Sequence, residues 1–248
     1  MPSAPWTPRH TAAALAGGHL LIAGAPGTGK SRLLNGTLLP ALVRAGDPLL
    51  VIQDPATGHG PTLGLRAATF GREAAVGDLL ARPTLVTFTG THPEREAQAE
   101  RLFADLPAAL AAAPAPAGAR RFLVIDVAPL TPGLRSFAPL LRQARSLGCT
   151  LIVTCQSPSS LEPGLPALFT SHVAFYHFYK RCLRVMAENV LAATGAEETN
   201  PSGKPTPINR FGQPLATPAS RMVGKLGDLK VGECFLVTPG APYEPLRT

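Results

Sequence analysis

The chain has 248 residues, of which 45% are hydrophobic, and its 23 Lys and Arg against 16 Asp and Glu give a formal net charge of +7. This length suits one large α/β domain with a full core. No apolar run approaches the roughly 20 residues of a transmembrane helix, and the proline-rich start lacks a secretory signal. We therefore expect a soluble, cytoplasmic protein, whose basic balance points weakly to an anionic partner.

The cysteines and histidines indicate neither a disulfide framework nor a metal site. No two cysteines form a C-x-x-C pair, so we expect reduced and mostly buried thiols. The cysteines are Cys149, Cys155, Cys182 and Cys234. His172 and His177 fall on a predicted strand, and we expect partly buried core or interface residues there rather than ligands.

The first predicted element is an apolar strand that runs directly into a phosphate-binding loop. Residues 19–31 read His-Leu-Leu-Ile-Ala-Gly-Ala-Pro-Gly-Thr-Gly-Lys-Ser, which contains the P-loop spacing G-x-x-x-x-G-K-S. Its glycines permit positive φ, so that backbone amides can surround the β-phosphate at a helix N-terminus. Lys30 adds a charge on the β- and γ-phosphates, and Ser31 offers a hydroxyl to Mg²⁺. The loop predicts binding of ATP with Mg²⁺, through Gly24, Ala25, Pro26, Gly27, Thr28, Gly29, Lys30, Ser31 and Arg32.

Alternating strands and helices follow the loop. Apolar spacing predicts a helix over 31–45, which Pro40 kinks or ends early. A buried strand is expected at 49–54 and another at 84–89, with a mixed, Gly-rich stretch between them. A long helix is expected over 93–113.

A second set of elements completes the pattern. We expect a strand at 121–126, a helix at 133–146, and further strands at 150–156 and 171–178. Strand and helix alternation of this kind predicts a mostly parallel central sheet flanked by helices, with the ligand at the carboxyl ends of the strands.

The strand at 121–126 ends in a carboxylate. It reads Arg-Phe-Leu-Val-Ile-Asp, and in a P-loop fold such a strand is the Walker B element, which acts on Mg²⁺ through its aspartate. This reading assigns Asp126 to the metal together with Ser31. The alternative is an ordinary buried strand with a capping aspartate.

The order of these motifs resembles the FtsK/HerA superfamily of DNA-pumping ATPases. The resemblance rests on residues 19–31, on Val-Ile-Asp at 124–126 and on Arg-Ser-Leu-Gly-Cys-Thr-Leu-Ile-Val-Thr-Cys-Gln-Ser-Pro at 145–158. It covers roughly residues 18–180, and residues 229–240 resemble the closing strand pair of those motors. It implies a RecA-like fold with a C-terminal β extension, working as a hexameric ring with ATP bound between neighbouring subunits.

The resemblance also assigns roles to individual residues. Gln156 would sense the γ-phosphate or the attacking water, although a strand-end amide that bonds the backbone would look the same. Arg145 falls where coupling ATPases carry an arginine finger, which stabilises transition-state charge in the neighbouring subunit. Arg142 is a rival finger, and a solvated helix face is the competing explanation for both.

One position departs from the family pattern. The family follows its Walker B aspartate with a glutamate, whereas this chain has Val127, which cannot accept a proton. Asp54 is our candidate for the missing base because it ends the strand after the P-loop helix, although a turn-forming Asp before a proline would look alike. Glu162 is a weaker substitute, and a nucleotide-dependent switch with little hydrolysis is the remaining alternative.

The resemblance suggests how the chain is divided and where DNA binds. We expect an N-terminal extension at 1–17 and a single RecA-like domain at 18–248, with a flexible or basic loop at 195–225. Residues 200–210 are rich in Pro, Ser and Gly. One interpretation is that they contact DNA, and the alternative is that they form a disordered surface loop. Further candidates for DNA contact are His59, Arg66 and Arg72.

The chain resembles a bare motor, because it shows neither the winged-helix domain of chromosome translocases nor the all-α domain of coupling proteins. This layout is most similar to the genome-packaging ATPases of membrane-containing, double-jelly-roll viruses, which pump double-stranded DNA through a capsid vertex. Its partners would be DNA, copies of itself and a capsid vertex or membrane protein. The alternatives are a plasmid conjugation or secretion ATPase and, in another class, an ATP-binding assembly switch.

Overall fold

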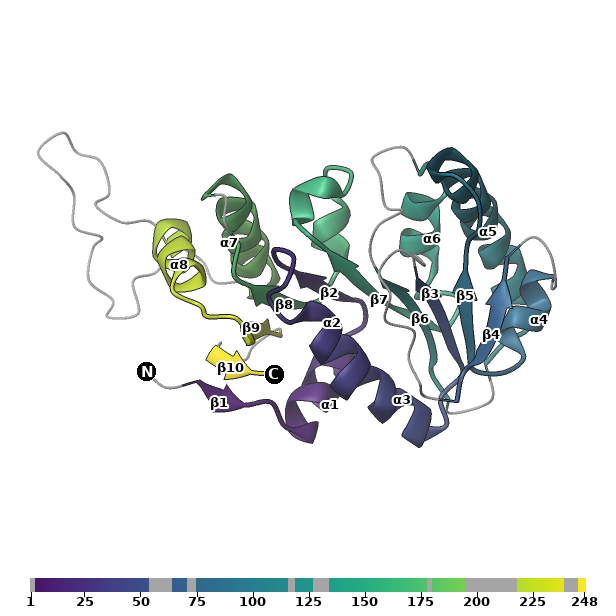
Figure 1. Ribbon diagram of the computed structural model, residues 1–248, viewed down its shortest axis with the longest axis horizontal. Coiled ribbons are helices and arrows are strands. Elements are labelled where there is room, and N and C mark those ends of the chain that lie inside the picture. Colours follow the sequence, from purple (N-terminus) through teal and green to yellow (C-terminus); the bar gives the residue numbers. More distant parts are fainter. Residues whose placement is uncertain are drawn as a thin grey trace, which may run out of the picture.

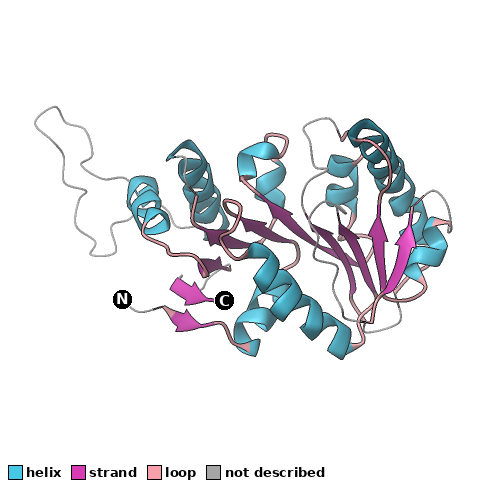
Figure 2. Ribbon diagram, in the orientation of Figure 1, coloured by secondary structure: helices cyan, strands magenta, loops and turns pink. Residues whose placement is uncertain are grey.

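The computed structural model describes eight stretches of the chain. They are residues 3–53, 64–70, 75–115, 119–126, 134–177, 180–194, 218–238 and 245–248. The described strands form one continuous layer, with helices on both sides of it (Figures 1 and 2). This arrangement confirms the predicted α/β class with a mostly parallel central sheet.

The sheet has ten strands in the order β1-β10-β9-β8-β2-β7-β6-β3-β5-β4. The strands are β1 Ala4–Pro5, β2 Leu20–Ala23, β3 Leu49–Gln53, β4 Arg66–Thr69, β5 Thr84–Thr87, β6 Arg121–Asp126, β7 Cys149–Cys155, β8 Ser171–Phe175, β9 Glu233–Val237 and β10 Pro245–Arg247. All neighbours from β8 to β4 pair in parallel, whereas β9 is antiparallel to both β8 and β10. The phosphate loop therefore follows a central strand, and the C-terminal β extension is antiparallel.

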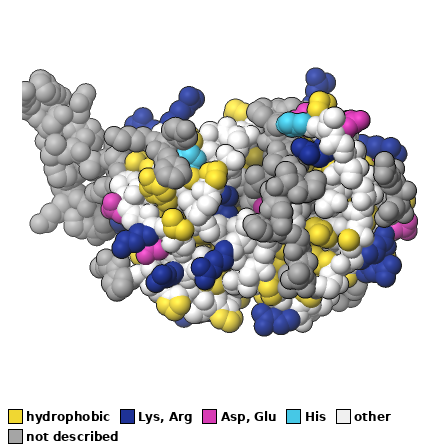
Figure 3. Space-filling model, viewed as in Figure 1, with side chains coloured by type: hydrophobic (Ala, Val, Ile, Leu, Met, Phe, Trp, Pro, Cys, Tyr) yellow, Lys and Arg dark blue, Asp and Glu magenta, His cyan; other side chains and the backbone are white. Residues whose placement is uncertain are grey.

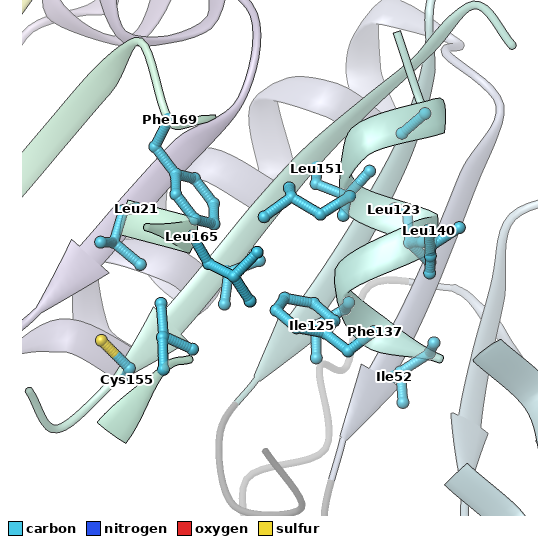
Figure 4. Packing of buried hydrophobic residues seen from close by; sticks show 14 of the residues in the cluster. Leu21, Ile52, Leu123, Ile125, Phe137, Leu140, Leu151, Cys155, Leu165 and Phe169 are labelled. Atoms are coloured by element: carbon cyan, nitrogen blue, oxygen red, sulfur yellow. The ribbon is translucent and has the colours of Figure 1, made fainter. Parts of the chain in front are cut away.

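Each face of the sheet has its own core and its own helices. Helices α1 Pro8–Ala16, α2 Lys30–Leu33 and α3 Leu39–Ala45 cover one face. Helices α4 Val76–Leu80, α5 His92–Ala112, α6 Phe137–Gln143, α7 Lys180–Thr194 and α8 Pro218–Gly227 cover the other. In the second core, Phe137 of α6 lies beside Ile125 of β6 (Figure 4).

The central strands are mostly apolar because both of their faces are covered. Every residue of β2, β3, β6, β7 and β8 is buried. This is the burial expected of parallel strands between two helical layers, and it explains why these strands read as continuous apolar runs. None of the described helices is both long and apolar enough to span a bilayer.

The helix after the phosphate loop is interrupted, as the sequence predicts from Pro40. A π-helical turn at Leu34–Leu38 separates α2 from α3. There the Leu39 N–H bonds the Leu34 carbonyl, five residues back. Proline has no N–H for the ordinary helical bond, and the π-helical turn directly precedes it. The helix then continues to Ala45, so Pro40 does not end it early.

Several predicted elements differ from the observed ones. The strand β4 lies inside the stretch to which we assigned no element, because it is a short edge strand of mostly small residues rather than an apolar run. The predicted helix at 133–146 is shorter and spans Phe137–Gln143. Helix α8 begins inside the range 195–225 that we expected to be a loop, of which 195–217 lies outside the described residues. The long helix is observed at His92–Ala112 and runs through its internal proline.

The two ends of the chain add strands to the same edge of the sheet. Within the predicted N-terminal extension, β1 pairs in parallel with β10 and α1 follows directly. The Trp6 N–H donates to the Arg247 carbonyl at 2.8 Å, and the Ser3 hydroxyl donates to the Glu233 carboxylate at 2.9 Å. The first residues are therefore packed against the last ones.

Two buried histidines are neutral near pH 7. Nδ1 of His19 accepts the Leu151 N–H at 3.0 Å, and burial together with the positive charge of Arg145 lowers the pKa of His19 to about 4. Burial also lowers the pKa of His172 to about 4, although the hydrogen bond of its ring with the Phe169 carbonyl acts in the opposite direction and raises the pKa. His172 and His177, which we expected to be partly buried core or interface residues, are both buried.

We expect the protein to lose stability between pH 7 and pH 5. Unfolded histidines bind a proton near pH 6.5 while His19 and His172 stay neutral in the folded chain, so acid favours the unfolded state. The loss is about 2 kcal/mol for each histidine. Urea unfolding at both pH values measures it, and His172→Gln should remove about half of the pH dependence. An unfolding free energy that stays constant over this range would contradict the assignment.

Candidate functional site

The phosphate loop adopts the backbone that its glycines predict. The φ angles of Gly24, Gly27 and Gly29 are 159°, 75° and 116°. Neighbouring strands hold the start of the loop, because the Gly24 N–H donates to the Cys155 carbonyl at 3.2 Å and the Ala25 N–H to the Tyr176 carbonyl at 2.9 Å. The loop is thus anchored at the ends of β7 and β8.

Gly24 permits the close approach of strand β8. A Cβ atom at this position would lie 2.5 Å from Cβ of Phe175, which is closer than real Cβ atoms approach other atoms. Within the loop, the Thr28 hydroxyl donates to the Ala25 carbonyl at 2.8 Å and closes the turn. The packing of the loop against Phe175 of β8 therefore requires glycine at position 24.

Lys30 lies inside the loop, where the terminal phosphates of a nucleotide belong. Its Nζ donates to the carbonyls of Gly24 and Ala25 at 2.7 and 2.8 Å, and the residue is only 8% exposed. Burial lowers the pKa of Lys30, while the nearby Cys155 thiol and Asp126 carboxylate offset part of this shift by favouring the charged amine. The amine is therefore held by the loop, near the carboxylate at the end of β6.

The next residues of the helix face outward. Ser31 is partly exposed and Arg32 is exposed in the first turn of α2. Ser31 thus offers an accessible hydroxyl beside the buried Lys30 amine, and the P-loop spacing predicts that this hydroxyl binds a phosphate-bound cation.

Asp126 is held by two polar partners that the sequence reading missed. Its carboxylate is buried at the end of β6, where Oδ2 accepts from the Gln53 amide at 3.2 Å and Oδ1 accepts from the Thr154 hydroxyl at 2.7 Å. Gln53 lies directly opposite Asp126 in the register of β3 and β6. The only sequence signal for both partners is a polar side chain near the end of an apolar strand.

Removing the Thr154 hydroxyl should weaken the binding of Mg²⁺ through Asp126. Thr154→Val keeps the shape of the side chain but removes the donor to Oδ1, whereas Thr154→Ser retains it. Groups that orient a metal-binding carboxylate contribute about 10- to 100-fold to metal affinity or activity. We expect Thr154→Val to raise the Mg²⁺ concentration needed for half-maximal ATP turnover by about tenfold, and Thr154→Ser to leave it near the wild-type value. Equal Mg²⁺ dependence in both variants would contradict a positioning role.

Gln156 follows β7 directly, next to the start of the phosphate loop. The residue before it, Cys155, pairs with Ala23 and accepts the Gly24 N–H. The Gln156 side chain is exposed, so it is accessible to a bound nucleotide. Lys30 follows β2, Gln156 follows β7 and Asp126 ends β6, so these three residues lie at the carboxyl ends of three adjacent strands.

Burial and the charge of Lys30 also lower the pKa of His177, which follows β8 and is 5% exposed. A neutral histidine therefore lies near the loop amine. The sequence reading assigned it only to the core or an interface.

Arg145 lies near the amino end of β2, whereas the phosphate loop of the same chain follows the carboxyl end of that strand. Its Nη2 donates to the Gly17 carbonyl at 3.3 Å, just before β2 begins, and its guanidinium covers Gly18. Arg120 similarly bonds the Leu15 carbonyl at 2.9 Å. Both arginines thus bind carbonyls at the end of α1, which gives Arg145 a structural contact independent of any action on a neighbouring subunit.

The remaining candidates are separated from this cluster or lie outside the described residues. Arg142 is exposed in the last turn of α6, and Glu162 is exposed after β7. Asp54 and Val127, which follow Gln53 and Asp126 directly, are outside the described residues.

One DNA-contact candidate lies on a strand and not on a loop. Arg66 begins strand β4, opposite Thr84 at the start of β5, and so lies at the amino ends of the strands. His59, Arg72 and residues 200–210 are outside the described residues.

The cysteines agree with the expectation of free thiols. Cys149, Cys155 and Cys234 are free and buried, and Cys182 is free and partly buried. Burial raises the pKa of Cys155 to about 12, which keeps this thiol protonated beside the loop.

Neither family models nor curated proteins match the chain, but solved structures do. It is similar to the genome-packaging NTPase B204 of Sulfolobus turreted icosahedral virus 2 in complex with AMPPCP, with a TM-score of 0.61 and 14% identity over 92% of this chain and 96% of that one. It is also similar to the plasmid coupling protein TrwB in complex with ADP and Mg²⁺, with a TM-score of 0.62 and 14% identity over 100% of this chain and 88% of that one.

TrwB with the GTP analogue GDPNP gives a TM-score of 0.62 at 13% identity, over 100% of this chain and 89% of that one. At these identities the likeness concerns the fold, and it agrees with the fold that the sequence resemblance implied. The chain has the RecA-like P-loop NTPase fold that it shares with a viral genome-packaging NTPase and a plasmid coupling protein.

Proposed function

We propose that this protein is an ATP-driven motor that moves double-stranded DNA, and that it packages DNA into a viral capsid. The observation that carries the proposal is the position of Lys30, Asp126 and Gln156 at the carboxyl ends of neighbouring strands, with the Lys30 amine near the Asp126 carboxylate. The likeness of the whole chain to a packaging NTPase and to a coupling protein supports it. Chemically, the arrangement suits phosphoryl transfer to water.

Each residue has a definable task in this proposal. The loop amides and the Lys30 amine bind the phosphates, and Ser31 with Asp126 would hold Mg²⁺. When bound, Mg²⁺ offsets the charge of the phosphates during transfer. Gln53 and Thr154 orient the Asp126 carboxylate. Gln156 orients or senses the attacking water.

Water activation is assigned to Asp54, because Val127 cannot accept a proton. Asp54 follows Gln53, whose side chain already touches Asp126. Asp54→Asn should leave ATP binding intact and abolish turnover, and unchanged turnover would exclude this role. Glu162 is the weaker substitute.

The proposal includes a ring in which a neighbouring subunit completes the site. Such a ring would be hexameric, and Arg145 or Arg142 would supply the arginine finger. The exposed position of both side chains supports access from another subunit. Because Arg145 bonds a carbonyl at the end of α1, Arg142 is the freer of the two to enter the site of a neighbouring subunit.

DNA would contact basic side chains of several subunits. Lys and Arg are spread over the face seen in Figure 3 and outnumber Asp and Glu in the chain as a whole. Residues 200–210 are proposed as the DNA-contacting loop, and charge removal there should flatten the salt dependence of DNA binding.

Two other functions share part of this support. A plasmid conjugation or secretion ATPase would use the same site, as the likeness to TrwB suggests. Val127 favours an ATP-binding assembly switch with little hydrolysis. A purified chain whose ATP turnover rises on addition of duplex DNA supports a motor, whereas ATP binding without turnover, with or without DNA, supports the switch.

A further inference from the structure

The turn that precedes β9 lies directly against the phosphate loop. The Gly232 N–H donates to the Thr28 carbonyl at 2.9 Å, and Cα of Gly232 is 3.3 Å from the position that a Cβ on Gly29 would take. The N–H and the hydroxyl of Thr248 both bond the Gly232 carbonyl, at 2.8 and 3.2 Å. The N–H and the carbonyl of Gly232 are thus both hydrogen-bonded, and the bond to Thr28 holds the turn against the loop.

The turn is also internally rigid. The Glu233 N–H donates to the Lys230 carbonyl at 2.9 Å, and Gly232 has the positive φ of 84° that the third position of a type II turn requires. The Glu233 carboxylate accepts from the Lys230 N–H and from the Ser3 hydroxyl, both at 2.9 Å. Those bonds lower the pKa of Glu233, so its carboxylate stays ionised and keeps the turn closed.

Val231 occupies the outer corner of this turn. Its side chain is 75% exposed, and among the described residues it is the one large hydrophobic side chain that is exposed. A single exposed apolar residue is ordinary on a protein surface. What distinguishes Val231 is its place, one residue from the glycine that contacts the phosphate loop.

The geometry of the site fixes the side from which a nucleotide base would approach. Strand β2 lies between β7 and β8, and Asp126 is on β6, beyond β7. Because Lys30 and Asp126 lie near each other, the terminal phosphates belong on the β7 side of the loop. The sugar and base then extend to the other side, toward β8 and β9 (Figure 1). The Val231 turn lies on that side against the loop, because its Gly232 contacts Thr28 and Gly29.

We propose that Val231 packs against the base of the bound nucleotide. This inference rests on the proposed function, because it needs a nucleoside triphosphate in the loop. The flat face of a base and the valine side chain would both leave water on contact. A valine side chain offers no hydrogen-bonding group, so the contact strengthens the binding of ATP and GTP alike and does not select between them.

Inorganic tripolyphosphate isolates the contact, because it has the phosphates of ATP without the base. Binding of Mg²⁺ complexes of ATP, GTP and tripolyphosphate is measured by calorimetry for the full chain and for Val231→Ser. We expect Val231→Ser to weaken ATP and GTP by roughly tenfold each, with unchanged tripolyphosphate binding. Val231→Ile should retain the wild-type affinities.

Each other outcome overturns the inference. Equal weakening of ATP and tripolyphosphate would mean that the turn only supports the loop, as expected for Gly232→Ala, which strains the positive φ beside Thr28. No weakening of ATP would mean that Val231 does not touch the base, and a loss of oligomers in sedimentation would then assign it to a contact between copies. A wild-type chain that binds neither ATP nor tripolyphosphate would instead contradict the proposed function.

Discussion

Lys30→Ala is expected to lower ATP turnover by at least about 100-fold. The Lys30 amine is buried, is fixed by two loop carbonyls and lies near Asp126, so we expect it to act on the terminal phosphates. Its charge acts where negative charge develops in the transition state. Steady-state phosphate release from the purified variant measures the loss.

Lys225→Ala is the matched control, because Lys225 is exposed on α8 and lies outside the phosphate loop. It loses the same charge and should keep wild-type turnover. Circular dichroism should show that Lys30→Ala is still folded, since the change removes only two hydrogen bonds, each of about 1 kcal/mol. Turnover by Lys30→Ala at the rate of Lys225→Ala would contradict the role of this amine.

Asp126→Asn is expected to reduce Mg²⁺-dependent turnover by at least about 100-fold. The substitution keeps the size of the side chain but removes the charge that attracts the cation. The asparagine keeps a side-chain oxygen that can still accept a hydrogen bond from the Thr154 hydroxyl. Titrating Mg²⁺ at saturating ATP separates a loss of metal affinity from a loss of the chemical step.

Asp78→Asn is the control for the loss of a negative charge. Asp78 is exposed on α4, which connects β4, the edge strand, with β5. It should retain both the wild-type turnover and the wild-type Mg²⁺ dependence. Nucleotide binding in the absence of Mg²⁺ should be similar in Asp126→Asn and wild type. If Asp126→Asn hydrolyses ATP with unchanged Mg²⁺ dependence, Asp126 is a capping residue and the Walker B reading is wrong.

The sequence was sufficient for the elements whose signal is local. The P-loop spacing and the apolar runs before Asp126 and Gln156 predict three strands that the structure confirms. These strands are buried on both faces, so their composition alone identifies them. The short edge strand β4 has no such signal, because its stability comes from pairing with β5.

The parts of the site that could not be predicted depend on contacts between distant segments. Gln53 reaches Asp126 only because β3 and β6 are neighbours, an order that no local pattern encodes. Gly232 meets Thr28 only because the C-terminal strands return beside β8. Arg145 was read as an arginine finger from its spacing before Gln156, and its packing against α1 became visible only in three dimensions.

Displacement of a labelled third strand from a triplex on duplex DNA tests the central claim most directly, because only a protein that moves along the duplex removes it. With ATP and Mg²⁺, the wild-type protein is expected to release the third strand, and Lys30→Ala is expected to leave it bound. Release that needs no ATP, or ATP hydrolysis on this DNA without release, would contradict an ATP-driven DNA motor.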